Sequence, residues 1–290
     1  MSTSSRLGRI IGLLALAVAL FGCSTVKLGY NTLGEIAYWW LHGYVDFSAD
    51  QAPRVREDLA RLHLWHRGHE LARLADMLHR MEELAPGNVS PAQVCVFAAQ
   101  LRERLNATAA QAEPALITLA MSLAPEQLRH LEQKYEANNA EYRKKWGRLT
   151  AGELAQKRYD EFLERSETFY GRLGEPQRAV LRRQVEHSAF DPRRELAERL
   201  RRQQDALQIL RRISGEPMSF NEARGLLRGY LARVQEPPLP DHRGYQHALI
   251  EEACRTFAGL HNSTNPAQRE AAVRRLQGYQ RDLRELAGRQ

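Results

Sequence analysis

Apolar residues recur every three or four positions along most of the chain, which is the spacing of one face of an α-helix. Two such stripes are Leu71, Leu74, Leu78, Met81 and Leu128, Leu131, Tyr135, Tyr142, Trp146. No segment alternates apolar and polar residues for long, as a half-buried strand would. The pattern therefore predicts an all-α protein in which these stripes form the core.

Helix starts are marked by a small polar residue followed three positions later by Gln or Glu, the pattern of a capping box. It occurs at Ser48–Gln51, Ser90–Gln93, Thr150–Glu153, Ser219–Glu222 and Asn265–Gln268. Pro- and Gly-containing clusters mark the breaks. Together these marks predict helices over 32–46, 49–85, 91–122, 125–149, 151–173, 175–213, 219–235, 243–261 and 266–288. Helices of this length favour a multi-helix bundle or a short stack of helical hairpins.

The N-terminus has a different pattern. Two arginines and no acid precede an apolar run over 10–21, which ends at Gly22-Cys23. A positive start, a short apolar run and a small residue before the cut are typical of a secretory signal. The run is shorter than the roughly 20 residues of a membrane span. The alternatives are an ordinary signal peptide with a chance cysteine and a lipoprotein signal.

Leu20-Phe21-Gly22-Cys23 resembles the lipobox of bacterial lipoproteins. That resemblance implies a signal peptide over 1–22 and a covalent diacylglycerol and N-acyl lipid on Cys23, with no other cofactor. Ser24 follows where an inner-membrane lipoprotein would carry an aspartate, so the resemblance implies the outer membrane, facing the periplasm. We expect residues 23–31 to be a lipid-anchored tether and 32–290 a single helical domain with a hinge at 237–240.

The formal net charge is +7, but basic and acidic residues alternate along the chain instead of forming blocks. Such mixing is typical of solvated helical faces. Export makes nucleic acid a poor partner, whereas anionic lipid headgroups and acidic envelope polymers fit the expected location.

The segment that follows the tether is rich in aromatic residues: Tyr30, Tyr38, Trp39, Trp40 and Tyr44. Trp and Tyr are favoured at membrane–water interfaces, and they also dominate core burial. About eight residues separate Cys23 from Tyr30, a reach of roughly 25 Å at full extension, so the segment stays near the bilayer. Two interpretations remain open, a membrane-interface or docking surface and a buried core.

Histidines cluster at His63, His66 and His69, and on a helix His63, His66 and Glu70 share one face. A catalytic zinc site needs a further ligand, and the position that completes the zincin pattern holds Arg73. We expect no metal site, with His63, His66 and Glu70 as weak candidate ligands. We expect His66 and Glu70 to satisfy each other as hydrogen-bonding partners near the core.

Cys95 and Cys254 are the other two cysteines. In an oxidising compartment they either form a disulfide or remain two buried thiols.

The first third of the chain resembles a family of proteobacterial lipoproteins of unknown function. The resemblance rests on the lipobox, Tyr30-Asn31, Trp39-Trp40-Leu41, Tyr44, Asp46, Gln51, Trp65-His66-Arg67 and Glu70. A second resemblance is to helical periplasmic chaperones with Leu-Thr-x-x-Gln motifs. It rests on Phe47-Ser48-Ala49-Asp50-Gln51, Val89-Ser90-Pro91-Ala92-Gln93 and Leu123-Ala124-Pro125-Glu126-Gln127. A capping box explains the same Ser-to-Gln spacing.

The sequence carries no Gly-rich phosphate loop, no Gly-x-Ser-x-Gly elbow and no Cys-x-x-Cys pair. It therefore favours a non-enzymatic, lipid-anchored scaffold or binding protein with a protein or envelope-polymer partner. One alternative is a chaperone-like or stress-related binder of exposed apolar segments, which would need an apolar concave patch left open. A peptidoglycan- or lipid-acting enzyme would need converging carboxylates or histidines.

Overall fold

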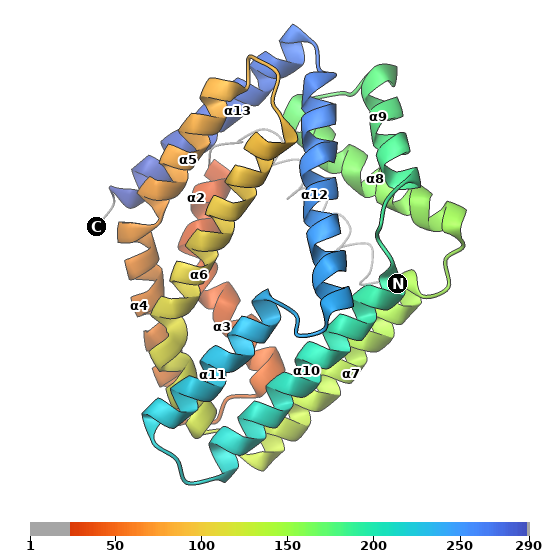
Figure 1. Cartoon of the computed structure of the whole chain (residues 1–290). Coiled ribbons are helices and arrows are strands. Elements are labelled where there is room, and N and C mark those ends of the chain that lie inside the picture. The colour runs from red at the N-terminus through yellow and green to blue at the C-terminus, as the bar shows by residue number, and fades with distance from the viewer. Residues whose placement is uncertain (1–23, 289–290) are drawn as a thin grey trace, which may run out of the picture.

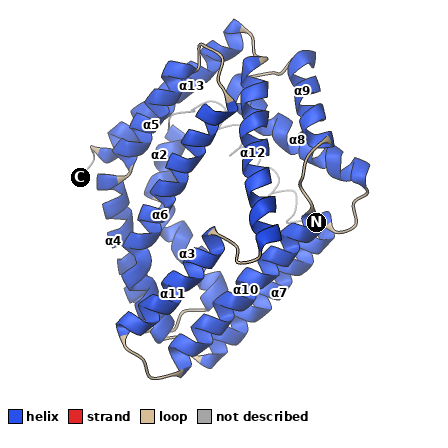
Figure 2. Ribbon diagram, viewed as in Figure 1, coloured by secondary structure: helices blue, strands red, loops and turns tan. Residues whose placement is uncertain are grey.

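The computed structural model describes residues 24–288, which form helices and no strand (Figure 2). The helices are α2 (Ser24–Asn31), α3 (Leu33–Val45), α4 (Gln51–His69), α5 (Leu71–Leu84), α6 (Pro91–Met121), α7 (Pro125–Trp146), α8 (Ala151–Tyr170), α9 (Glu175–Glu186), α10 (Pro192–Gly215), α11 (Phe220–Gln235), α12 (Pro240–Asn262) and α13 (Pro266–Ala287). The predicted all-α, multi-helix fold is confirmed. The signal peptide predicted over 1–22 and the predicted lipidation site, Cys23, lie outside the described residues.

The predicted capping pairs stand at helix starts. Ser90, Thr150, Ser219 and Asn265 each accept a hydrogen bond from the backbone N–H three residues on, and the partner side chain reaches back to the cap. Ser48 and Gln51 exchange the same two bonds at the start of α4. The local pattern therefore gave these helix starts correctly.

The helix predicted over 49–85 is divided at Glu70, between α4 and α5. The Glu70 N–H still bonds to the His66 carbonyl at 2.9 Å, and Gly68 precedes the division by two residues. Glycine is unfavourable in a helix interior, so Gly68 weakens the helix next to this division.

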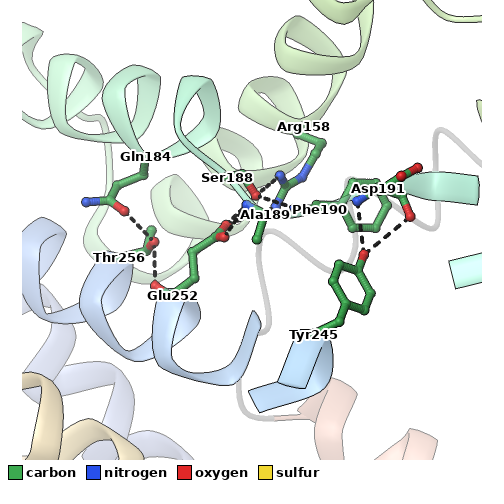
Figure 3. Close-up of polar contacts among 9 residues, drawn as sticks. All are labelled: Arg158, Gln184, Ser188, Ala189, Phe190, Asp191, Tyr245, Glu252 and Thr256. Atoms are coloured by element: carbon green, nitrogen blue, oxygen red, sulfur yellow. Dashed lines mark hydrogen bonds and ion pairs between the residues drawn. The ribbon is translucent and has the colours of Figure 1, made fainter. Parts of the chain in front are cut away.

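The helix predicted over 175–213 is also divided, between α9 and α10. Asp191 caps α10 ahead of Pro192, and the residue before a proline is disfavoured in the helical region. Side chains of α12 hold the intervening loop: Glu252 accepts from the Ala189 N–H at 2.8 Å, and the Tyr245 hydroxyl accepts from the Asp191 N–H at 2.9 Å (Figure 3). The split therefore leaves no unpaired N–H at these positions.

The helices run along the sides of a frame (Figure 1). On one side α5 packs along α13 and α4 continues from α5; on another α7 packs along α10. Helix α12 packs on α6 and α9, while α13 packs on α5, α8 and α2. Segments far apart in the sequence thus lie side by side. None of the described helices is long and apolar enough to cross a membrane.

The buried apolar residues form separate clusters. One, around Leu173, Leu181 and Leu260, joins α8, α9, α12 and α13; another, around Ile117 and Ile213, joins α6, α10 and α11. A third joins α3 to α4 through Tyr38, Phe47 and Val55. The structure also links Cys95 of α6 to Cys254 of α12 by a disulfide, with the Cα atoms 5.5 Å apart.

Candidate functional site

Two glutamines lock the starts of α4 and α7 together, an arrangement that we call the first junction. The Gln51 amide donates to the Ser122 carbonyl at 2.9 Å, and the Gln127 amide donates to the Asp46 carbonyl at 3.0 Å. The two side chains also bond to each other, at 2.7 and 3.2 Å. Each glutamine therefore caps its own helix and holds the loop before the other.

Glutamines at the starts of α9 and α13 likewise each bond to the loop before the other helix, and we call this the second junction. Gln177 donates to the Ser263 carbonyl and Gln268 to the Arg172 carbonyl, while each accepts from the cap residue of its own helix. In all four cases the accepting carbonyl comes directly before a buried residue. These buried residues are Phe47, Leu123, Leu173 and Thr264.

An open cleft of about 430 Å³ lies beside the first junction, between α3, α6, α7, α10 and α11. Its lining is mostly apolar and includes Leu116, Leu119, Leu131 and Ile209. Leu128, Leu131 and Tyr135 of the predicted α7 stripe all face it. A volume of roughly 300–1,000 Å³ is typical of ligand pockets, so the cleft is of binding-site size.

Polar side chains also border the cleft. Asn138 donates to the Tyr44 hydroxyl at 2.8 Å, and Gln203 accepts from Asn139 at 2.7 Å. Arg199 lines the cleft and lies over the Tyr142 ring, 5.6 Å from its centroid, and the ion pairs among the described residues do not involve it. The guanidinium is therefore available to pair with an anionic group in the cleft.

Two phenols of the cleft are held in their protonated form. Burial raises the pKa of Tyr135 to about 12, and burial also raises the pKa of Tyr230. At neutral pH both hydroxyls keep their proton and can donate a hydrogen bond to a ligand. The lining residues thus offer apolar contacts, hydrogen bonds and one cation, without carboxylate, imidazole or thiol groups.

A smaller apolar cavity of about 210 Å³, the side hollow, lies near the second junction and is lined by side chains including Leu101, Phe169 and Phe257. His261 and Tyr170 also line it, but the Tyr170 hydroxyl bonds to Nδ1 of His261 at 3.0 Å and Nε2 donates to the Gly87 carbonyl at 2.9 Å. Their polar atoms are therefore occupied within the protein.

The aromatic segment has buried, half-buried and exposed members. Tyr38 is 3% exposed and packs into the core, with Arg56 lying 3.6 Å from its ring centroid. Trp39 and Trp40 are each 60% exposed. Tyr30 and Tyr44 are half-buried, and the tilted rings of Trp40 and Tyr44, with centroids 4.7 Å apart, line the cleft.

The histidine cluster is engaged by other side chains. The Tyr30 hydroxyl lies 3.0 Å from Nδ1 of His66, and the Tyr30 ring packs on His63 at 4.6 Å. Buried Glu70 pairs with Arg73 at 2.9 Å instead of satisfying His66, which corrects that expectation. Burial lowers the pKa of both His63 and His66. Among residues 24–288, no group of three or more His, Cys, Asp or Glu is arranged to hold a metal ion.

Sequence reasoning missed most of the cleft, including Leu116, Arg199 and Tyr230, because its walls come from helices far apart in the chain. It also missed the locking role of Gln127, Gln177 and Gln268. The signal that could have found this role is a residue, buried in the structure, four positions before each glutamine. Among the junction glutamines, this spacing was noted in the sequence only before Gln51 and Gln127.

A comparison with protein families matches residues 43–228 to a family described as a family of unknown function (DUF6279). Comparisons with curated proteins and with solved structures found no match to the chain. The family match covers more than half of the chain and includes the whole of α4 to α10, so most of the cleft lies within it. The chain therefore belongs to this family of unknown function, DUF6279.

Proposed function

We propose that this protein is a non-enzymatic binding protein of the bacterial cell envelope, anchored by lipid on Cys23 to the periplasmic face of the outer membrane. Its binding site is the cleft between α3, α6, α7, α10 and α11, and its ligand is an apolar segment of another envelope protein. The observation that carries the proposal is the apolar cleft of about 430 Å³, left open beside a rigid junction and bordered by polar side chains.

The chemistry of the cleft supports a segment that carries an acid as well as apolar side chains. Leu119 and Leu131 offer apolar surface, the Tyr135 phenol offers a donor, and Arg199 offers a charge. Pockets of this kind, mostly apolar with a few convergent polar groups, orient a ligand and give it specificity. An apolar segment with a nearby carboxylate satisfies all three.

A chaperone-like role is the second candidate, favoured by the same open apolar surface. The buried-residue and glutamine pattern of the junctions adds to the resemblance to the Leu-Thr-x-x-Gln chaperones. The two candidates differ in the number of clients: a scaffold binds one or a few partners, whereas a chaperone binds many unfolded chains.

Site-specific photocrosslinking in cells tests the proposal. A photoreactive residue at Leu116, on the rim of the cleft, is compared with one at Leu101, on the rim of the side hollow of the same helix. We expect discrete crosslinked proteins from position 116 and none from position 101. Many products from position 116 would favour the chaperone role, and equal yields from the two positions would contradict the cleft as the binding site.

A further inference from the structure

The first two helices leave an apolar face uncovered. The term apolar face is used here for the exposed large apolar residues of α2 and α3: Leu28, Leu33, Ile36, Trp39 and Trp40. Leu28 is 68% exposed and Ile36 is 56% exposed. On α3 the positions 33, 36 and 40 share one side of the helix, while Tyr38, on the opposite side, packs into the core. One side of α3 therefore holds the protein and the other offers apolar surface to its surroundings.

We propose that the apolar face lies in the membrane–water interface of the bilayer that holds the N-terminus. The inference rests on the anchoring in the proposed function. It goes further by naming the apolar face as the surface of the protein that contacts the bilayer. A helix with an apolar face and interfacial Trp residues buries that face roughly 5–10 Å into the headgroup and acyl boundary.

The position of the face in the chain selects this occupant. Helix α2 begins at Ser24, directly after Cys23 and the apolar run over 10–21. Leu33 is ten residues from Cys23, and those residues are mostly helical, with a rise of about 1.5 Å each. The face thus begins within roughly 15 Å of the anchored residue and ends at Trp40 within roughly 25 Å of it, so no partner protein is needed to bring it to the membrane.

The chemistry at the edge of the face also fits a lipid surface. The exposed Arg56 guanidinium lies 5.9 Å from the Trp39 ring centroid, where it can meet a lipid phosphate while the indole lies deeper. Trp rings are favoured at this depth because they are apolar bodies with an N–H group that stays hydrated. The exposed acid within this segment, Glu35, lies on a different side of α3 from positions 33, 36 and 40.

The contacts of α2 fix the orientation of the face. Lys27 bonds to Glu285 and forms an ion pair with buried Asp282 at 3.3 Å, so α13 holds the side of α2 that carries Lys27, while the next residue, Leu28, stays exposed. Trp40 belongs both to the apolar face and to the lining of the cleft. With the face on the bilayer, the rim of the cleft lies at the membrane surface.

Tryptophan quenching by brominated lipid tests the inference on the full chain, purified from membranes and reconstituted into brominated phosphatidylcholine vesicles. One variant, with Trp65→Phe and Trp146→Phe, keeps only Trp39 and Trp40; the other, with Trp39→Phe and Trp40→Phe, keeps only Trp65 and Trp146, which are not part of the apolar face. We expect the first variant to lose most of its emission in brominated relative to ordinary vesicles, and the second to lose little. Equal losses, or none from Trp39 and Trp40, would overturn the inference.

Vesicle flotation separates the two proposals. If the chain floats but Trp39 and Trp40 are not quenched, the anchor is retained, and only the inference that the apolar face lies in the bilayer is refuted. A chain that does not float refutes the anchor and, with it, the inference that rests on it. In the first background, Ile36→Asp should reduce quenching, while Leu239→Asp, at an exposed leucine before α12, should leave it unchanged.

Discussion

The two junctions use the same hydrogen-bonding scheme but border different surroundings. At the first, Gln51 and Gln127 stand beside a cleft with polar side chains on its border and an exposed tryptophan on its rim. At the second, Gln177 and Gln268 stand beside a packed core around Leu173, and the nearby side hollow has its polar atoms already bonded. The difference indicates that one device for fixing helix starts supports an open surface in one region and a closed core in the other.

Truncation of a core leucine should have the largest effect and should separate the two regions. Leu173 is 1% exposed within the second region, and Leu173→Ala is expected to cost about 2–5 kcal/mol of the free energy of unfolding. Leu131→Ala removes the same atoms beside an existing opening, so its cost should lie near or below the low end of that range. Urea titrations of both variants provide the comparison, and equal costs would show that the first region is as closed as the second.

Loss of a junction glutamine should have the next largest effect. Gln268→Ala leaves the Arg172 carbonyl without its donor, and an unmade hydrogen bond of a buried group costs about 1–3 kcal/mol. Gln51 is half-buried, so Gln51→Ala should cost less. Because Gln51 and Gln127 bond directly, a double-mutant cycle should give a coupling of at least about 0.5 kcal/mol. Strict additivity would contradict the lock.

Acid should destabilise the second region through His261. Burial lowers the pKa of His261 from its usual value of 6.5, and both nitrogens are used by the neutral ring. The unfolded chain therefore binds more protons, and stability falls as the pH drops below about 6.5. Urea midpoints at several pH values should show this loss, and His261→Gln should flatten it. An unchanged slope in the variant would assign the effect to His63 and His66, whose pKa values are also lowered.

Rim substitutions should have the smallest effect on stability. Leu116 and Leu101 are partly exposed residues of α6, one beside the cleft and one beside the side hollow. Leu116→Glu and Leu101→Glu should each change the free energy of unfolding by no more than about 0.5 kcal/mol, as expected for exposed sites. Thermal or urea unfolding checks this, and a larger loss at Leu116 would show that it is part of the core.

Local sequence signals predicted the helices well, because caps such as Ser90 with Gln93 act within one turn of the chain. The division before Pro192 was missed because it is held by contacts with α12. The division at Glu70 was missed because the one local signal there, Gly68, does not interrupt the apolar periodicity. The sequence showed that the segment is aromatic but not which of its rings are buried. Tyr38 is buried and the neighbouring Trp39 is exposed because α3 packs on α4 through Tyr38. The cleft arises from five helices and left no local pattern that could locate it.

The most direct test of the cleft as a binding site measures partner capture in the two rim variants, Leu116→Glu and Leu101→Glu. A photoreactive residue at Tyr230, inside the cleft, reports the yield of crosslinked partner in cells. Binding in the cleft predicts that Leu116→Glu abolishes the crosslink, because a carboxylate replaces apolar contact surface, while Leu101→Glu leaves it unchanged. Equal yields in both variants would contradict the cleft as the site at which this protein binds its partner.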